Sequence, residues 1–140
     1  MRPAGADSLI YSQDVKYCAR QILADFWHHE RSWQYEGMED LCGFHSARLL
    51  PVPWLSARKA GLTWGNTICV STHLSLRQYR DTIAHELVHV LATSPRYEWL
   101  NSYVAAHHDR RAFQEAVAIR VGRMCAARAR SQAFRRRLRF

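Results

Sequence analysis

Apolar side chains recur at helical spacing in three stretches of the chain. In residues 12–30 an apolar residue returns at every third or fourth position, the pattern of an amphipathic helix, and Ser12 suits its N-cap. Residues 75–92 show the same stripe, which Pro95 ends because the residue before a proline is disfavoured in helical geometry. A third stripe begins near Asp109. We therefore expect an N-terminal, a central and a C-terminal helix.

Two short segments between the first two helices have the composition of strands. They are PVPWLSAR, residues 51–58, and NTICVST, residues 66–72, with Gly61 and Gly65 between them as turn markers. Residues 31–50 follow neither period, so no element is assigned to them. The predicted fold class is α+β: a small domain with an N-terminal helix, a short antiparallel sheet, a central helix and a C-terminal helix.

Charge is unevenly distributed along the chain. The 140 residues carry a formal net charge of +8, and residues 109–140 alone hold ten Arg against two acidic residues. The rest of the chain is therefore neutral overall, which excludes a uniformly basic nucleic-acid coat. We expect a single domain, residues 1–140, in which residues 128–140 form a basic Arg-rich C-terminal extension.

The composition and the N-terminal sequence also indicate in which cellular compartment the protein is expected. Apolar residues make up 48% of the chain, too many for a disordered protein, yet no run reaches the roughly 18 apolar residues of a membrane span. The N-terminal residues lack the apolar core of an export signal, so a cytoplasmic protein without a membrane partner is expected. The four cysteines form no CxxC pair and are expected to be free, mostly buried thiols: Cys18, Cys42, Cys69 and Cys125.

The strongest chemical signal is the HELVH motif at residues 85–89. Four residues advance a helix by about 400°, so His85 and His89 stand on one helix face, one turn apart, where both can bind one metal ion. Glu86 can reach a metal-bound water, whose pKa zinc lowers to about 7, and remove its proton. Chance would produce such a motif in this composition only about 0.02 times. One zinc ion is therefore the expected cofactor.

A catalytic zinc needs a third protein ligand and an open fourth position. His108 is the favoured third ligand, because it opens the next helix beside Asp109, which can cap that helix or orient an imidazole. His107 and Glu115 remain as alternative third ligands, the latter two turns into the helix.

Tyr97 and Tyr103 lie between the motif and these candidate ligands. Either hydroxyl could stabilise a tetrahedral oxyanion by donating a hydrogen bond, although tyrosine also serves as a half-buried packing residue.

The basic C-terminal segment suggests contact with DNA phosphates, which would hold a peptidase beside DNA-associated substrates. A solvated helix end, where Arg suits the helix dipole, is the alternative interpretation. The candidate nucleic-acid contacts are Arg128, Arg130, Arg135, Arg136, Arg137 and Arg139.

About half of the chain carries an ordered set of pieces: VPWLSARKAG, GLTWGNTICVS, LRQYRDTIAHELVHVL, and then His108-Asp109 through Phe113 to Arg120-Val121-Gly122. This order resembles a minimal SprT-like (Spartan-type) zinc metallopeptidase domain without a zinc ribbon. The resemblance implies that His85, His89 and His108 bind zinc and that Glu86 is the general base. It also implies a protein substrate, in some members a DNA-bound one.

A second zincin family offers an alternative. The TIAHELVH segment and Glu115-Ala116-Val117-Ala118 also resemble the ImmA/IrrE-like peptidases, which inactivate repressors. The working hypothesis is a zinc-dependent endopeptidase, with the SprT-like interpretation placed before the ImmA/IrrE-like one. The competing hypothesis from another class is a non-catalytic, zinc-stabilised nucleic-acid-binding module. The oligomeric state is open.

Overall fold

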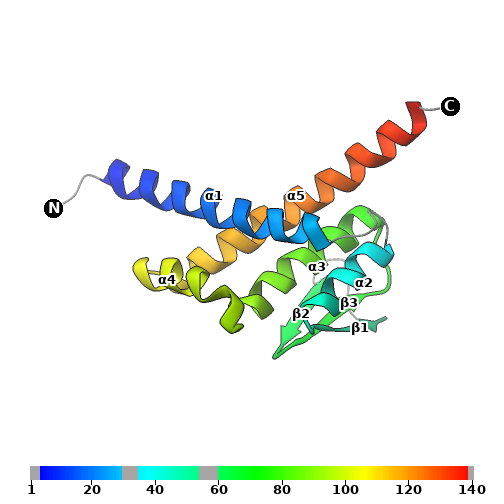
Figure 1. The fold of residues 1–140 in the computed structure, drawn as a ribbon, viewed down its shortest axis with the longest axis horizontal. Helices are drawn as coiled ribbons and strands as arrows, with labels where there is room; N and C mark the ends of the chain where they lie inside the picture. The colour runs from blue at the N-terminus through cyan, green and yellow to red at the C-terminus, as the bar shows by residue number, and fades with distance from the viewer. Residues whose placement is uncertain (1–3, 30–34, 54–59, 139–140) are drawn as a thin grey trace.

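The computed structural model describes residues 4–29, 35–53 and 60–138, with side chains for residues 9–29, 35–53 and 60–128. Within these residues the fold is α+β, as predicted, with five α-helices and a three-stranded sheet (Figure 1). None of the described helices is both long and apolar enough to cross a membrane. The elements are α1 (Ala4–His29), α2 (Tyr35–Phe44), β1 (Arg48–Val52), β2 (Gly61–Trp64), β3 (Thr67–Ser71), α3 (Leu76–Leu91), α4 (Glu98–Ala106) and α5 (Arg110–Leu138), with a 3₁₀ turn at Pro95–Tyr97 before α4.

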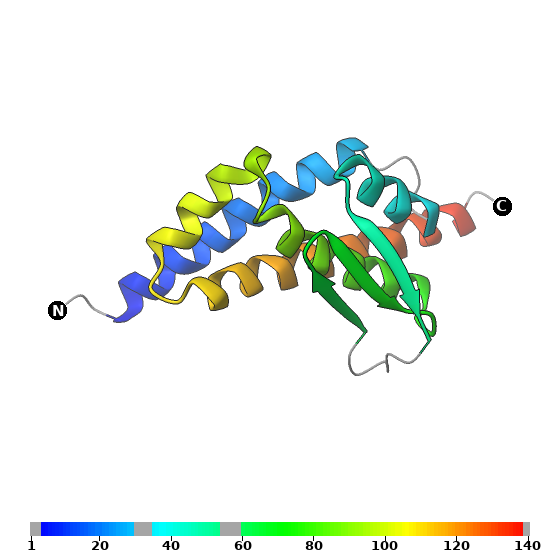
Figure 2. The ribbon, with the colours of Figure 1, turned by 90° about the horizontal axis from the view of Figure 1, so that it is seen from below.

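Helix α3 lies at the centre of the arrangement. It packs against α5 on one side and against α2, β2 and β3 on the other, while α1 lies across α5 (Figures 1 and 2). Its buried residues Ile83, Leu87 and Leu91 join the core together with Phe113 and Val117 of α5. The HELVH motif is therefore held between the sheet and the C-terminal helix.

The sheet has the order β1-β3-β2, with β1 parallel and β2 antiparallel to β3. The predicted short antiparallel sheet is therefore confirmed for the β2–β3 pair, whereas β1 pairs in parallel with β3. A tight turn at Gly65, which has a φ of 61°, folds β2 back onto β3, and β1 pairs with the other edge of β3. The alternation of polar and apolar residues predicts strands without predicting their partners.

The boundaries of the other elements differ in places from those expected. Helix α1 begins at Ala4, so Ser12 lies inside the helix and is not its N-cap. The strand expected at residues 51–58 corresponds to β1, which starts earlier and ends at Val52; residues 54–59 lie outside the described part. Helices α2 and α4 and strand β2 were not predicted, since each is short and its apolar pattern is weak.

Both predicted helices of the site region are confirmed, and side-chain caps define where they start. Ser75 Oγ accepts a hydrogen bond from the Gln78 N–H at 3.2 Å, and Gln78 Oε1 accepts one from the Ser75 N–H at 3.0 Å, which is a capping box for α3. Asp109 Oδ1 accepts from the Ala112 N–H at 3.0 Å at the start of α5. None of the four cysteines forms a disulfide, as expected, and only Cys69 is not fully buried.

Helices α3 and α5 approach each other closely at Gly122. A Cβ atom at this position would lie 2.3 Å from Asp81 Oδ1 and 2.8 Å from the Asp81 carbonyl oxygen, so only glycine fits. Nearby, the buried Arg80 of α3 donates from Nε to the Cys125 carbonyl of α5 at 2.9 Å. These contacts fix how far along α3 each turn of α5 lies.

The close contact at Gly122 predicts that alanine at this position destabilises the protein, the opposite of its usual effect in a helix. In an unobstructed helix, replacing glycine by alanine stabilises by up to about 1 kcal/mol. Gly122→Ala should instead lower the free energy of unfolding by about 1–3 kcal/mol, because α3 and α5 must move apart. Equilibrium unfolding in urea measures the change.

Gly43→Ala is the matched control, because this helical glycine in α2 has nothing within 4 Å of an added Cβ. It should be neutral or stabilising. An equal response of the two variants would contradict the close α3–α5 contact.

Candidate metal centre

Three side chains from two helices converge on one point. His85 and His89 belong to α3, and their ring centroids lie 5.2 Å apart. Glu115 of α5 reaches both: Oε1 lies 2.9 Å from His85 Nε2, and Oε2 lies 2.9 Å from His89 Nε2. One ligand atom from each residue lies within 4.8 Å of the others, so the group could hold a metal ion.

The packing of α3 on α5 produces this convergence. The two histidines share a helix face because they are four residues apart, while Leu87 and Val88 between them are fully buried. On α5, Glu115 lies within about 60° of the buried residues Ala118 and Gly122 around the helix axis, on the side that faces α3. Each helix therefore contributes its polar group at the rim of a shared apolar contact.

Gln114 supports the cluster from beside Glu115. Its Oε1 lies 2.6 Å from His89 Nδ1, which makes it an acceptor for an N–H at that ring atom. Histidines that bind metals commonly donate their second ring N–H to such a partner, which fixes the tautomer and the ring orientation. With its Nδ1 engaged in this way, His89 presents Nε2 to the cluster.

The centre is accessible from outside. The side chains of His85 and His89 are 21% and 23% exposed, and that of Glu115 is 46% exposed. A closed structural site would have buried ligands, whereas these three side chains are partly open to solvent, Glu115 most of all.

Glu86 is held by the edge strand β2. The Thr63 hydroxyl donates a hydrogen bond to Glu86 Oε2, and it lies 3.3 Å from the backbone carbonyl of the same residue. Strand β2 can lie this close because Gly61 has no side chain: a Cβ there would lie 2.5 Å from Thr82 Cγ2 and 3.2 Å from Glu86 Cγ. Sequence analysis missed Thr63, since nothing in the sequence shows which strand residue faces the motif.

Asp81 lies one turn before His85 on α3. Burial raises the pKa of its carboxyl above the ordinary value, and the neighbouring charges of His85 and Arg123 partly offset this. Asp81 is also the residue against which Gly122 packs, so this carboxyl lies at the junction of the two helices that form the centre.

The structure does not bring His108 or His107 into the cluster. His108 is exposed and precedes α5, whereas Glu115 lies inside that helix. His107 Nε2 lies 2.8 Å from Asp14 Oδ2 of α1, and its ring stacks on Phe113 with centroids 4.3 Å apart. Among the three candidate third ligands, Glu115 is the one that reaches both motif histidines.

The two candidate oxyanion donors line a different cavity, between α1 and α4, together with Asp25. The Tyr97 hydroxyl donates to Asp25, and burial together with this hydrogen bond raises its pKa. Tyr103 packs against Tyr17 of α1, with ring centroids 5.6 Å apart. Tyr97 thus joins the 3₁₀ turn to α1, and Tyr103 joins α4 to α1.

Of the candidate nucleic-acid contacts, only Arg128 has a described side chain. Its guanidinium lies over the Trp27 ring of α1, 4.8 Å from the centroid. Arg130, Arg135, Arg136 and Arg137 belong to α5, but their side chains lie outside the described part, as does the whole of Arg139.

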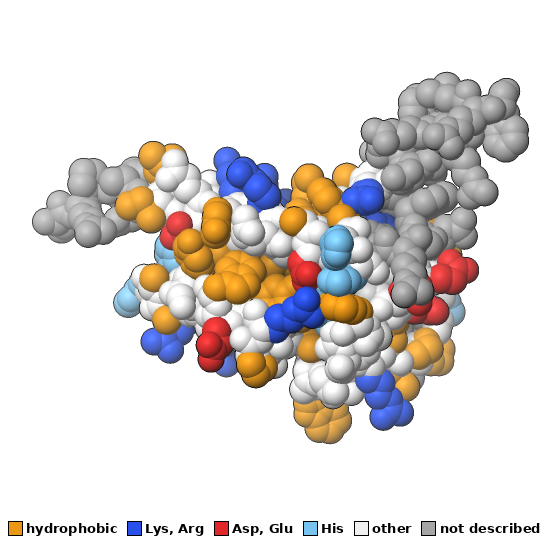
Figure 3. All heavy atoms as spheres, in the orientation of Figure 1, with side chains coloured by type: hydrophobic (Ala, Val, Ile, Leu, Met, Phe, Trp, Pro, Cys, Tyr) orange, Lys and Arg blue, Asp and Glu red, His pale blue; other side chains and the backbone are white. Residues whose placement is uncertain are grey.

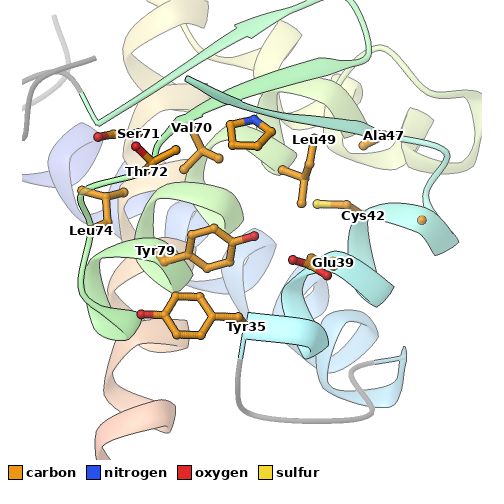
Figure 4. Close-up of a pocket in the computed structure, with 12 residues that line it drawn as sticks. Tyr35, Glu39, Cys42, Ala47, Leu49, Val70, Ser71, Thr72, Leu74 and Tyr79 are labelled. Atoms are coloured by element: carbon orange, nitrogen blue, oxygen red, sulfur yellow. The ribbon is translucent and has the colours of Figure 1, made fainter. Parts of the chain in front are cut away.

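A larger cavity, of about 540 Å³, lies between α2, the strands β1 and β3, and the first turn of α3 (Figure 4). Its lining is mainly apolar, with Tyr35, Tyr79 and Glu39 as polar groups near one end. Burial and the nearby Glu39 carboxylate raise the pKa of Tyr79 to about 12. None of the lining residues belongs to the metal cluster, and much of the lining comes from the segment to which the sequence assigned no element.

Residues 45–127 match the family model of the IrrE N-terminal-like domain, peptidase M78. This segment is more than half of the chain and contains the HELVH motif, Thr63 and Glu115. No curated protein and no solved structure gives a significant match. The chain therefore belongs to the IrrE N-terminal-like family of metallopeptidases.

Family membership supports the assignment to the zincin-like metallopeptidases made from the HELVH motif. Between the two resemblances drawn from the sequence, the match supports the ImmA/IrrE-like one and contains nothing specific to SprT-like proteins. The order of motifs from Val52 to Gly122 is therefore not specific enough to separate the two families.

Proposed function

We propose that this protein is a zinc-dependent peptidase of the ImmA/IrrE kind, in which His85, His89 and Glu115 hold the metal and Glu86 is the general base. The observation that supports it best is the Glu115 carboxylate, which lies 2.9 Å from Nε2 of both motif histidines. A carboxylate and two imidazoles on facing helices, open to solvent, are the ligands that a catalytic zinc site needs.

The donor set fits zinc. Zinc in catalytic sites takes three protein ligands with nitrogen and oxygen donors, two His and one Glu among the known sets, and keeps one position open. Gln114 supplies the hydrogen bond that fixes the tautomer of His89. Bound zinc would supply a Lewis acid that lowers the pKa of water to about 7 and polarises a peptide carbonyl.

Two residues of the chain, Glu86 and Thr63, have separate roles in the proposed proton transfer. Glu86 is adjacent to a ligand in sequence, and its carboxylate would accept the proton of the attacking water and later deliver it to the leaving amine. Thr63 donates to Oε2 of this carboxylate, which leaves Oε1 for the proton. Thr63 is thus a positioning residue that fixes the rotamer of the base.

The proposed substrate is a protein of the repressor type, following the ImmA/IrrE resemblance and the family match. The exposed Glu115 side of the centre offers a path for an extended peptide segment.

A test of the general base uses Glu86→Gln, which keeps the shape of the side chain but cannot take a proton. Zinc content should match that of the parent, while hydrolysis of unfolded casein should fall by at least about 100-fold, the range for a lost general base. Release of peptides and zinc by elemental analysis are measured on the same samples. Equal hydrolysis by parent and variant would refute the mechanism.

The role of Thr63 is tested by a matched pair. Thr63→Val removes the hydroxyl at nearly constant volume and should lower kcat about tenfold or more with little change in KM, because a hydrogen bond to a charged group is worth about 1.5–3 kcal/mol. Thr63→Ser keeps the hydroxyl and should retain most of the activity. A loss of equal size in both variants would assign Thr63 to packing alone.

A further inference from the structure

A second candidate site lies on the other side of α5, in a groove between α1 and α5. The groove has a volume of about 220 Å³ and is lined by three basic side chains around an apolar floor. Lys16 and Arg20 come from α1 and Arg120 from α5. The floor consists of Leu23, Ala24, Trp27 and Met124.

Among the residues that the structure describes, nothing acidic lines the groove to offset its positive charge. Lys16, Arg20 and Arg120 are exposed and form no ion pair with another described residue. Figure 3 shows Lys and Arg side chains along the upper edge of the molecule, over α1 and α5, with hydrophobic side chains between them. Unpaired cations on a shared rim favour an anionic partner.

Arg128 extends this positive surface along α5. It follows Arg120 by eight residues, about 12 Å along the helix axis, and its guanidinium is fixed over the Trp27 ring at 4.8 Å. A cation held on an aromatic face loses less side-chain entropy when it binds a phosphate than a freely moving one. The helix then continues to Leu138.

The groove and the metal centre lie on opposite faces of α5. At 100° per residue, Arg120, Met124 and Arg128 lie between about 140° and 180° around the helix axis from Glu115. Occupation of the groove would therefore leave the metal ligands free.

We propose that this groove, with Lys16, Arg20, Arg120 and Arg128, binds the phosphate backbone of nucleic acid without reading its sequence. A polyanion with regularly repeated phosphates matches cations spread over two turns of a helix better than a single small anion does. The same helix continues to Leu138, and residues 129–138 of the sequence include four further Arg. The inference concerns binding and does not depend on the peptidase activity.

The test measures binding of the full-length chain to a 20-base-pair DNA duplex by fluorescence anisotropy at several salt concentrations. Each lost phosphate contact lowers the slope of log affinity against log salt by about 0.9. The double variant Arg20→Gln/Arg120→Gln should therefore reduce the slope by about 2. If the two proteins bind equally at 1 M salt, this is roughly a 60-fold loss of affinity at 0.1 M.

The matched control is Arg110→Gln/Arg111→Gln, which removes the same charge from two exposed residues at the start of the same helix. It should leave the slope unchanged. If both double variants lower the slope equally, only the net charge of the chain matters for binding, and the proposal is overturned. So would an unchanged slope in the groove variant, or no binding by the parent.

Two further measurements keep the result interpretable. Thermal unfolding of the groove variant should match that of the parent, since both substituted residues are exposed. If the double variant is less stable, the single variants Arg20→Gln and Arg120→Gln replace it in the binding test, and each should lower the slope by about 1. Vesicles of anionic phospholipid should bind the chain more weakly than the duplex does. Tighter binding to the vesicles, lost in the groove variant, would assign the surface to a membrane and overturn the proposal.

Discussion

The contact between α3 and α5 is the constraint on which the site depends. Gly122 brings the two helices together so closely that a methyl group would overlap Asp81, and the buried Arg80 joins α3 to the Cys125 carbonyl. Because both helices are rigid, this contact determines which residue of α5 faces the two motif histidines, and that residue is Glu115. The geometry of the His85, His89 and Glu115 cluster is thus a consequence of core packing about two turns further along α5.

The local parts of this arrangement were predictable from the sequence, whereas the long-range parts were not. The spacing of His85 and His89 and the apolar stripe around them predict two imidazoles on one helix face, and the structure places them so. The third partner depends on the register between two helices, which no local pattern encodes. His108 is nearer in sequence to the motif, yet it precedes α5 and stays exposed. The same limit explains why strands were expected for β1 and β3 but not their parallel pairing, and why Thr63 of β2 was missed.

Helix α5 carries two chemically different faces. One face supplies Glu115 and Gln114 to the metal centre, and the other lines a basic groove with α1. Basic side chains therefore gather within the folded body as well as at the C-terminal end, at Lys16, Arg20 and Arg120. The proposed zinc site and the proposed nucleic-acid groove thus share α5 but use opposite faces of it. Each can bind its ligand without blocking the other.

The central claim is that Glu115 completes the metal centre, and zinc affinity tests it most directly. Competition titration with a chelator of known affinity should be applied to the parent and to the variants Glu115→Ala, His108→Ala and His107→Ala. The account predicts that Glu115→Ala weakens zinc binding by at least about 100-fold, more than the loss typical of a supporting residue, while both histidine variants bind zinc as the parent does. Loss of zinc in His108→Ala together with retention in Glu115→Ala would contradict the account.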